Sequence, residues 1–109
     1  MPRLAAPEAE YRDADGNALV LRGTLSPQTR HAYAAIVHDQ SRSTEDSWHR
    51  SVEFLFERLA VRWIVAGAPA EGQRELLARL RMAGQDERRW VRDVLREHLA
   101  EHFPDMEAP

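Results

Sequence analysis

Hydrophobic positions are densest between Leu59 and Ala66, where Arg62 is the only charged residue. The helix-period pattern that begins at Ser43 continues through this stretch and predicts one long helix that ends at Gly67. The second half of that helix has almost no polar face, and such a helix must be enclosed on all sides. A chain of 109 residues has little other protein to enclose it. Either the other helices wrap it completely or a second subunit covers it, and we expect a homodimer.

The N-terminal part of the chain carries a β-hairpin signal. Two segments, Glu8–Arg12 and Ala18–Leu25, flank the turn cluster Asp13–Asn17, in which Gly16 can take a positive φ. An isolated two-stranded hairpin is only marginally stable in water, so it must pack on the helices or pair its edge with that of a second copy. The hairpin is therefore a second indication of a homodimer.

Helix start and stop signals follow one another along the rest of the chain. Ser26 and Ser43 are typical N-cap residues, and Pro27 suits the first helical position. Besides the long helix from Ser43 to Gly67, the pattern predicts three helices: Pro27 to about Asp39, about Ala70–Met82, and Asp86 to about Phe103.

These elements predict a mainly α fold, in which an N-terminal β-hairpin is followed by a four-helix, bundle-like domain. Residues 8–103 form this single domain, and the Pro-containing residues 1–7 and 104–109 are expected to be tails. The length allows one hydrophobic core and is too short for two.

Composition removes several classes of function. The chain has no cysteine, which leaves no disulfide, no thiolate zinc site and no thiol redox chemistry. All 15 basic residues are arginine, but acidic residues are interleaved with them and the net charge is −3, so nucleic-acid binding is not expected. Uncharged runs are far shorter than the roughly 20 residues of a membrane span, and the N-terminus lacks the apolar core of a signal peptide. We expect a cytoplasmic protein without membrane contact.

A candidate metal site lies on the last predicted helix. His98 and His102 are four residues apart, so they face the same side and could share one metal ion, with Glu101 beside them as a possible base. This motif resembles the His-x-x-Glu-His motif of the inverted zinc metallopeptidases, a likeness of five residues that implies a zinc site completed by a downstream glutamate. Only Glu107 follows in this chain. The alternative is that the histidines border the apolar stripe at a helix C-terminus, where a partly charged imidazole is favourable.

Arg62 suggests a ligand pocket, because a guanidinium drawn into the interior must be paired with a carboxylate or with an anionic ligand. Aromatic side chains could line an apolar pocket around it: Trp48, Trp63, Trp90, Tyr33 and Phe56. Such a pocket would bind a small organic acid or an aromatic compound. The alternative is that the stem of Arg62 lies over the core while its head reaches water.

His49 is a further candidate ligand-binding residue. It lies with Glu53 and Glu57 at i, i+4 and i+8 on one side of the long predicted helix. Carboxylate-bridged metal sites in helical bundles use Glu-x-x-His, a spacing that is absent here, so a solvated face with ion pairs is the simpler interpretation.

No catalytic residue and no cofactor is predicted, because the chain has neither a Gly-x-Ser-x-Gly elbow nor a Gly-rich phosphate loop. We expect a small, cytoplasmic, dimeric helical module that acts without catalysis by binding a partner protein or a small organic ligand. The alternative class is a metalloprotein or small enzyme that uses His98, Glu101 and His102. A DNA-associated regulator is a third possibility, which the acidic balance disfavours.

Overall fold

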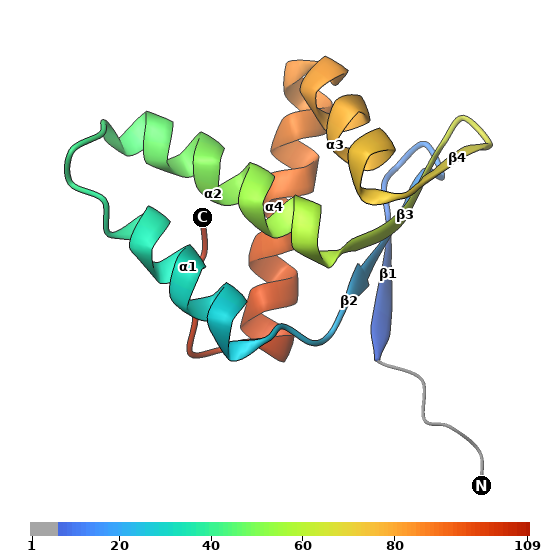
Figure 1. Cartoon of the computed structure of the whole chain (residues 1–109). Coiled ribbons are helices and arrows are strands. Elements are labelled where there is room, and N and C mark those ends of the chain that lie inside the picture. The colour runs from blue at the N-terminus through green and yellow to red at the C-terminus, as the bar shows by residue number, and fades with distance from the viewer. Residues whose placement is uncertain (1–6) are drawn as a thin grey trace, which may run out of the picture.

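The structure is a computed structural model that describes residues 7–109 (Figure 1). The elements of this range are, in chain order, β1 (Glu8–Arg12), β2 (Ala18–Arg22), α1 (Pro27–Val37), α2 (Thr44–Leu59), β3 (Ala60–Val65), β4 (Ala68–Glu71), α3 (Gln73–Met82) and α4 (Gln85–His102). None of these helices has the length and apolar character that a membrane crossing requires. The predicted tail at residues 1–7 lies outside the described residues, apart from Pro7.

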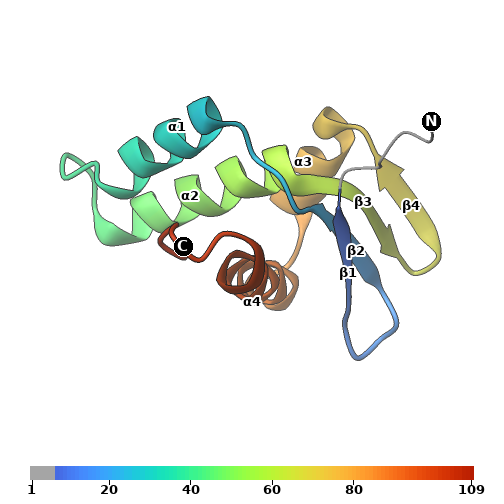
Figure 2. The same cartoon turned by 90° about the horizontal axis from the view of Figure 1, so that it is seen from below.

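The four strands form one antiparallel sheet in the order β1-β2-β3-β4. Figure 2 shows the helices gathered to one side of this sheet. The fold is therefore α+β, and the predicted mainly α fold of a hairpin followed by a four-helix bundle is wrong. The predicted N-terminal hairpin is present as β1 and β2, with Glu8 opposite Arg22 and Arg12 opposite Ala18, but it is only half of the sheet.

The error lies in the apolar run after α2. The helix ends at Leu59, and Ala60 takes an extended conformation (φ −67°, ψ 127°) from which β3 continues. The residues that follow are mostly β-branched or aromatic, which favours a strand: Val61, Trp63, Ile64 and Val65. The run is apolar because a six-residue strand lies between β2 and β4. It is not a helix that needs a second subunit to enclose it.

A two-residue turn at Ala66 and Gly67 joins β3 to β4. Both residues have positive φ angles, 51° and 78°, as tight hairpin turns require. Gly67, predicted as a helix stop, is therefore a hairpin glycine. Because β4 takes Ala68–Glu71, α3 begins at Gln73 and not near residue 70.

The predicted helix starts at Ser26 and Ser43 are confirmed. The Oγ atom of Ser26 accepts a hydrogen bond from the backbone N–H of Thr29, and that of Ser43 accepts one from Asp46, both at 3.1 Å. Each bond satisfies one of the free N–H groups of a first helical turn, which stabilises the helix by about 1 kcal/mol.

The hydrophobic core lies between the sheet and the helices. From the sheet it takes Leu19, Leu21, Trp63 and Ala70, and from α2 and α4 it takes Leu55, Phe56, Leu59, Val91, Leu95 and Leu99. Each large side chain contributes about 1.5–3 kcal/mol by leaving water. The core fixes α2 and α4 side by side, and the candidate site described below lies along that junction.

Residues 104–109, predicted to be a tail, turn back from the end of α4 toward α1 and α2 (Figure 1). Met106 packs against the core and Pro109 is buried. This segment therefore belongs to the packed part of the molecule.

Candidate functional site

A groove of about 470 Å³ lies between α2, the end of α3 and the first turns of α4. Trp48, Val52 and Leu80 supply its apolar surface. Its rim is polar and charged, with Thr44, Glu45, His49 and Glu53 from α2 and Gln85, Arg88, Arg89 and Arg92 from α4. We call this surface the Trp48 groove.

Trp48 is exposed to 46% of its surface, and within residues 7–109 only Met82 is another exposed large hydrophobic residue. The guanidinium of Arg92 lies over the Trp48 ring, 4.2 Å from its centroid, in a cation–π contact. Because Trp48 and Val52 are one turn apart on α2, the ring extends the apolar floor of the groove to the solvent. An exposed tryptophan that is held in place in this way is typical of a binding surface.

The α4 side of the groove is positively charged. Arg88 donates a hydrogen bond to the backbone oxygen of Arg81 at 2.9 Å, and Arg92 donates one to that of Pro109 at 3.2 Å. Arg88 therefore meets a neutral carbonyl group, and Arg92 meets a backbone oxygen of the last residue, Pro109, instead of a side-chain carboxylate. Arg89 makes no ion pair or hydrogen bond with its side chain within residues 7–109.

The α2 side of the groove offsets little of this charge. The carboxylate of Glu53 is already paired with Arg81, at 2.9 Å. Glu45 lies 3.9 Å from the Nε2 atom of His49, and both side chains are mostly exposed. The groove thus combines an apolar floor with a rim on which three arginines outnumber two glutamates, which favours anions.

This arrangement suits binding better than acid–base catalysis. His49 is the only imidazole on the rim, and the 3.9 Å to Glu45 is longer than the hydrogen bond that orients a catalytic base. Within the described part of the chain, no cluster of three or more His, Asp or Glu side chains could hold a metal ion.

The structure separates the residues of the predicted Arg62 pocket. Trp63 is 1% exposed in the core, where its ring lies edge-on to that of Phe56 at 5.6 Å between centroids. Arg62 is partly exposed and lies opposite Val20 and Glu71 in the sheet. Because neighbours on a strand point to opposite faces, Arg62 and Trp63 do not line one pocket.

The other predicted ligand-binding residues are also dispersed. Tyr33 is buried on α1, and its hydroxyl donates a hydrogen bond to the backbone oxygen of Glu107 at 2.6 Å. Trp90 is partly buried on α4 and packs against the core. Of the five candidates, His49 alone borders the Trp48 groove.

His98 is fully buried on α4, and both of its ring nitrogens are bonded. The Nε2 atom lies 2.6 Å from the backbone oxygen of Arg22, and the Nδ1 atom lies 2.8 Å from the hydroxyl of Tyr11. A carbonyl oxygen can only accept, so Nε2 carries the proton and Nδ1 accepts a hydrogen bond from Tyr11. His98 thereby ties α4 to both strands of the first hairpin.

A metal ion at the His98–His102 pair would need a free nitrogen lone pair on each ring. The lone pair of His98 accepts the hydrogen bond from Tyr11, and the two imidazole rings lie face to face at an angle of 36°, with 4.4 Å between centroids. Glu101, the proposed base, is exposed. This geometry favours the structural interpretation of the two histidines.

The network around His98 is uncharged. Burial lowers the pKa of His98 below its ordinary value, the hydrogen bond to Arg22 opposes this, and the nearby His102 lowers it further. Burial also raises the pKa of Tyr11 to about 12, with smaller contributions from Glu101 and Glu97, so the Tyr11 hydroxyl keeps its proton.

Sequence reasoning missed the Trp48 groove as a site. It assigns Trp48 to the Arg62 pocket, and it treats the arginines of the last helix as cancelled by neighbouring acids. The available signal was the spacing of Arg88, Arg89 and Arg92, which places guanidinium groups on adjacent turns of one helix. Which of them face α2 follows only from the packing.

Comparison of the chain with known protein families, with curated proteins and with solved structures finds no match.

Proposed function

We propose that this chain is a binding module without catalytic activity, and that the Trp48 groove takes a small organic anion with a flat apolar body. The observation that carries the proposal is that a half-exposed Trp48 lies in one groove with Arg89, whose guanidinium is unpaired within residues 7–109. The apolar floor would cover the ring system of the ligand, and Arg89 would bind its acid group.

The size of the groove agrees with this ligand class. Sites for small molecules commonly have volumes of about 300–1,000 Å³ and few, well-placed polar groups. The groove has about 470 Å³ and an apolar floor with charges confined to the rim. The ligand class is the one that the sequence suggested for an Arg62 pocket, at a different place in the molecule.

A cytoplasmic location and a homodimer remain part of the proposal, but neither follows from the groove. The absence of cysteine supports the cytoplasm. The apolar run at Leu59–Ala66 no longer supports a homodimer, because most of it is a strand inside the sheet. What supports the homodimer is the outer edge of β1, which is unpaired within residues 7–109. Sedimentation equilibrium tests it, because a dimer has twice the mass of the 12.5 kDa chain.

The test of the groove is a calorimetric titration with 2-naphthoate, an aromatic carboxylate. We expect Arg89→Gln to weaken binding by about tenfold or more, the loss expected for one charge-assisted hydrogen bond. Because Arg89 bonds to no other described residue, this variant should fold like the parent.

Arg74→Gln is the matched control, since Arg74 is an exposed arginine on α3 outside the groove. It should bind 2-naphthoate like the parent. Equal affinity of the parent for 2-naphthalenemethanol, which has the same ring without the charge, would contradict the anion assignment. Equal affinity of Arg89→Gln and the parent for 2-naphthoate would contradict the site.

The alternative function, a metalloprotein built on His98 and His102, has a separate test. Elemental analysis of protein purified without chelator measures metal per chain. Stoichiometric zinc that is lost in His98→Gln would show that His98 gives up one of its two hydrogen bonds to a metal ion, and would favour a metal-dependent activity over a binding module.

A further inference from the structure

The cleft between α1, α2 and α4 holds a piece of this chain. Residues 104–109 leave the end of α4 and lie between the helices, as the last part of the trace in Figure 1 shows. We call these residues the 104–109 segment and their location the segment cleft. Tyr33 from α1 and Arg92 and Arg96 from α4 are the residues that hold the segment.

The hydrogen bonds in the cleft are made to the backbone of the segment. The Tyr33 hydroxyl donates to the Glu107 carbonyl at 2.6 Å. Arg92 and Arg96 both donate to the Pro109 carbonyl, at 3.2 and 3.0 Å. Residues 104–106 form a turn, in which the Met106 N–H donates to the Phe103 carbonyl at 3.0 Å, so the three side chains hold the residues that follow the turn. Contacts to the backbone hold a peptide with little regard to its sequence.

Two side chains of the segment add selectivity. Met106 packs against the core and Pro109 is buried. The Glu107 carboxylate lies 3.6 Å from the Nε2 atom of His38, an exposed contact that contributes little energy. The cleft thus takes up an apolar side chain, and the acidic residue that follows it lies at the exposed rim beside His38.

The 104–109 segment does not fill the cleft. A cavity of about 480 Å³ remains on the side of α2, and one of about 430 Å³ remains beside Met106 on the side of α1. Both spaces are open to solvent, so they widen the path of the segment at the surface of the molecule. A segment with larger side chains could therefore occupy the same path.

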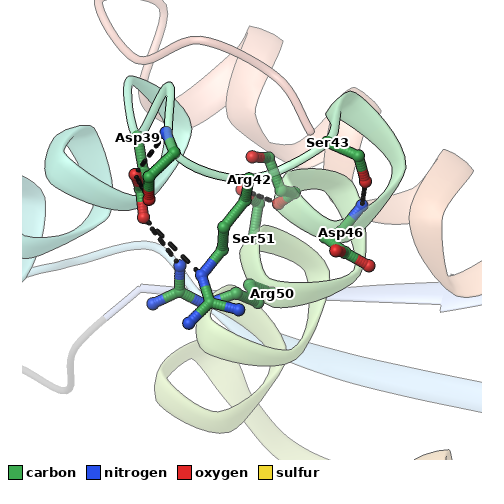
Figure 3. A network of polar contacts seen from close by, with 8 residues as sticks. Asp39, Arg42, Ser43, Asp46, Arg50 and Ser51 are labelled. Atoms are coloured by element: carbon green, nitrogen blue, oxygen red, sulfur yellow. Dashed lines mark hydrogen bonds and ion pairs between the residues drawn. The ribbon is translucent and has the colours of Figure 1, made fainter.

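The wall of the cleft at the α1–α2 connection is preformed. Figure 3 shows the Asp39 carboxylate paired with the guanidinium of Arg50, at 3.2 Å. The other carboxylate oxygen of Asp39 accepts hydrogen bonds from the backbone N–H and the hydroxyl of Ser41, at 3.0 and 2.6 Å. These bonds, the hydroxyl of Ser41 first, lower the pKa of Asp39. The negative charge of Asp39 is thus paired within the wall, whereas Arg92 and Arg96 direct their side-chain hydrogen bonds to the segment.

From this geometry we propose that the segment cleft is a recognition site for an extended acidic segment of a partner protein, and that the 104–109 segment occupies it within this chain. The site adjoins the Trp48 groove: Thr44 and Trp48 line both the groove and the 480 Å³ space beside the segment, and Arg92 borders the groove and bonds to Pro109. A partner segment would displace the 104–109 segment and take over its carbonyl contacts with Tyr33, Arg92 and Arg96.

The test uses the full chain with the double substitution Met106→Gly and Pro109→Gly, which removes the two packed side chains of the segment and leaves the cleft unchanged. The probe is an acetylated peptide with the sequence of residues 103–109 and a free C-terminal carboxyl group, which leaves the Pro109 oxygens that Arg92 and Arg96 contact unchanged. Hydrogen exchange of the variant first shows whether its 104–109 segment has left the cleft. NMR titration then measures binding of the peptide to the variant and to the parent.

We expect the variant to bind the peptide at least about tenfold more tightly than the parent, because the attached segment of the parent competes at a high effective concentration. The same peptide with glycine in place of the methionine is the matched control and should bind more weakly. A vacated cleft that does not bind the peptide overturns the proposal. So does a segment that stays protected in the variant, because it would then be a fixed part of the fold.

The proposal that the partner is a different protein is tested by measuring the mass of the parent protein at increasing concentration. If the mass of the parent increases with concentration and the double substitution abolishes the increase, the segment exchanges between copies of this chain. That result would overturn the assignment of the cleft to a different protein.

Discussion

At the scale of single residues, the buried imidazole of His98 joins elements that are far apart in the sequence. It accepts a hydrogen bond from Tyr11 in β1 and donates one to Arg22 in β2. The bond from Tyr11 requires the neutral ring, because a protonated Nδ1 could not accept from the Tyr11 hydroxyl, whereas the bond to Arg22 is compatible with either form. The first hairpin is therefore attached to α4 by a group whose protonation state depends on pH.

The free energy of unfolding should fall as the pH is lowered, starting near the ordinary His pKa of about 6.5. The folded-state pKa of His98 is lowered, so the unfolded chain takes up a proton that the folded chain resists. The stabilising contribution is present above the unfolded pKa and is lost as the pH falls through the folded one. Urea unfolding at pH 8 and at pH 5 measures the difference.

His98→Gln is the variant that tests this assignment. It should be less stable at pH 8 by about 1–3 kcal/mol, since a buried hydrogen-bond partner is lost, and its stability should change less between pH 8 and pH 5. The other four histidines are present in both proteins. An unchanged pH dependence would show that His98 is not the titrating group.

At the scale of elements, the sequence predicted the helix starts that carry a capping side chain, but not the change from helix to strand at Ala60. Ser26 and Ser43 mark helix starts that the structure confirms, because a capping side chain acts on its own first turn. The change from α2 to β3 at Ala60 carries no Gly or Pro, and it depends on pairing with β2, from which α1 and α2 separate it in the chain. Local patterns do not encode such a pairing partner.

The sequence predicted fewer features of the candidate site than of the fold. His49 was identified, whereas Arg62 and Trp63 were grouped by their closeness in sequence and point to opposite faces of β3. The Trp48 groove depends on which faces of α2 and α4 meet, and that is decided by packing across the core.

Two substitutions in the β3–β4 turn distinguish the strand from a helix. Gly67→Ala should lower the free energy of unfolding by about 1 kcal/mol, because φ is 78° there, and Ala66→Gly should raise it, because Ala66 is held at φ 51°. In a helix both signs reverse, since alanine is favoured over glycine by about 1 kcal/mol. Thermal or urea unfolding of the two variants gives both signs; a stabilising Gly67→Ala would contradict the turn.

At the scale of the whole molecule, the chain builds its sheet from two hairpins that are separated in sequence. β1 pairs with β2 and β3 pairs with β4, each through a short turn, whereas α1 and α2 lie between β2 and β3. This insertion supplies one wall of each candidate site, α2 in the Trp48 groove and α1 with α2 in the segment cleft, and α4 supplies the opposite wall.

This insertion determines the order in which the sheet can form. Each hairpin closes a short loop, but the central pairing of β2 with β3 must close the whole stretch of residues 23–59, and the entropic cost of closure grows with loop length. Contacts between distant residues also slow folding. We therefore expect the two hairpins to form early and to join only when α1 and α2 have brought their ends together, which makes the middle of the sheet its last part to assemble.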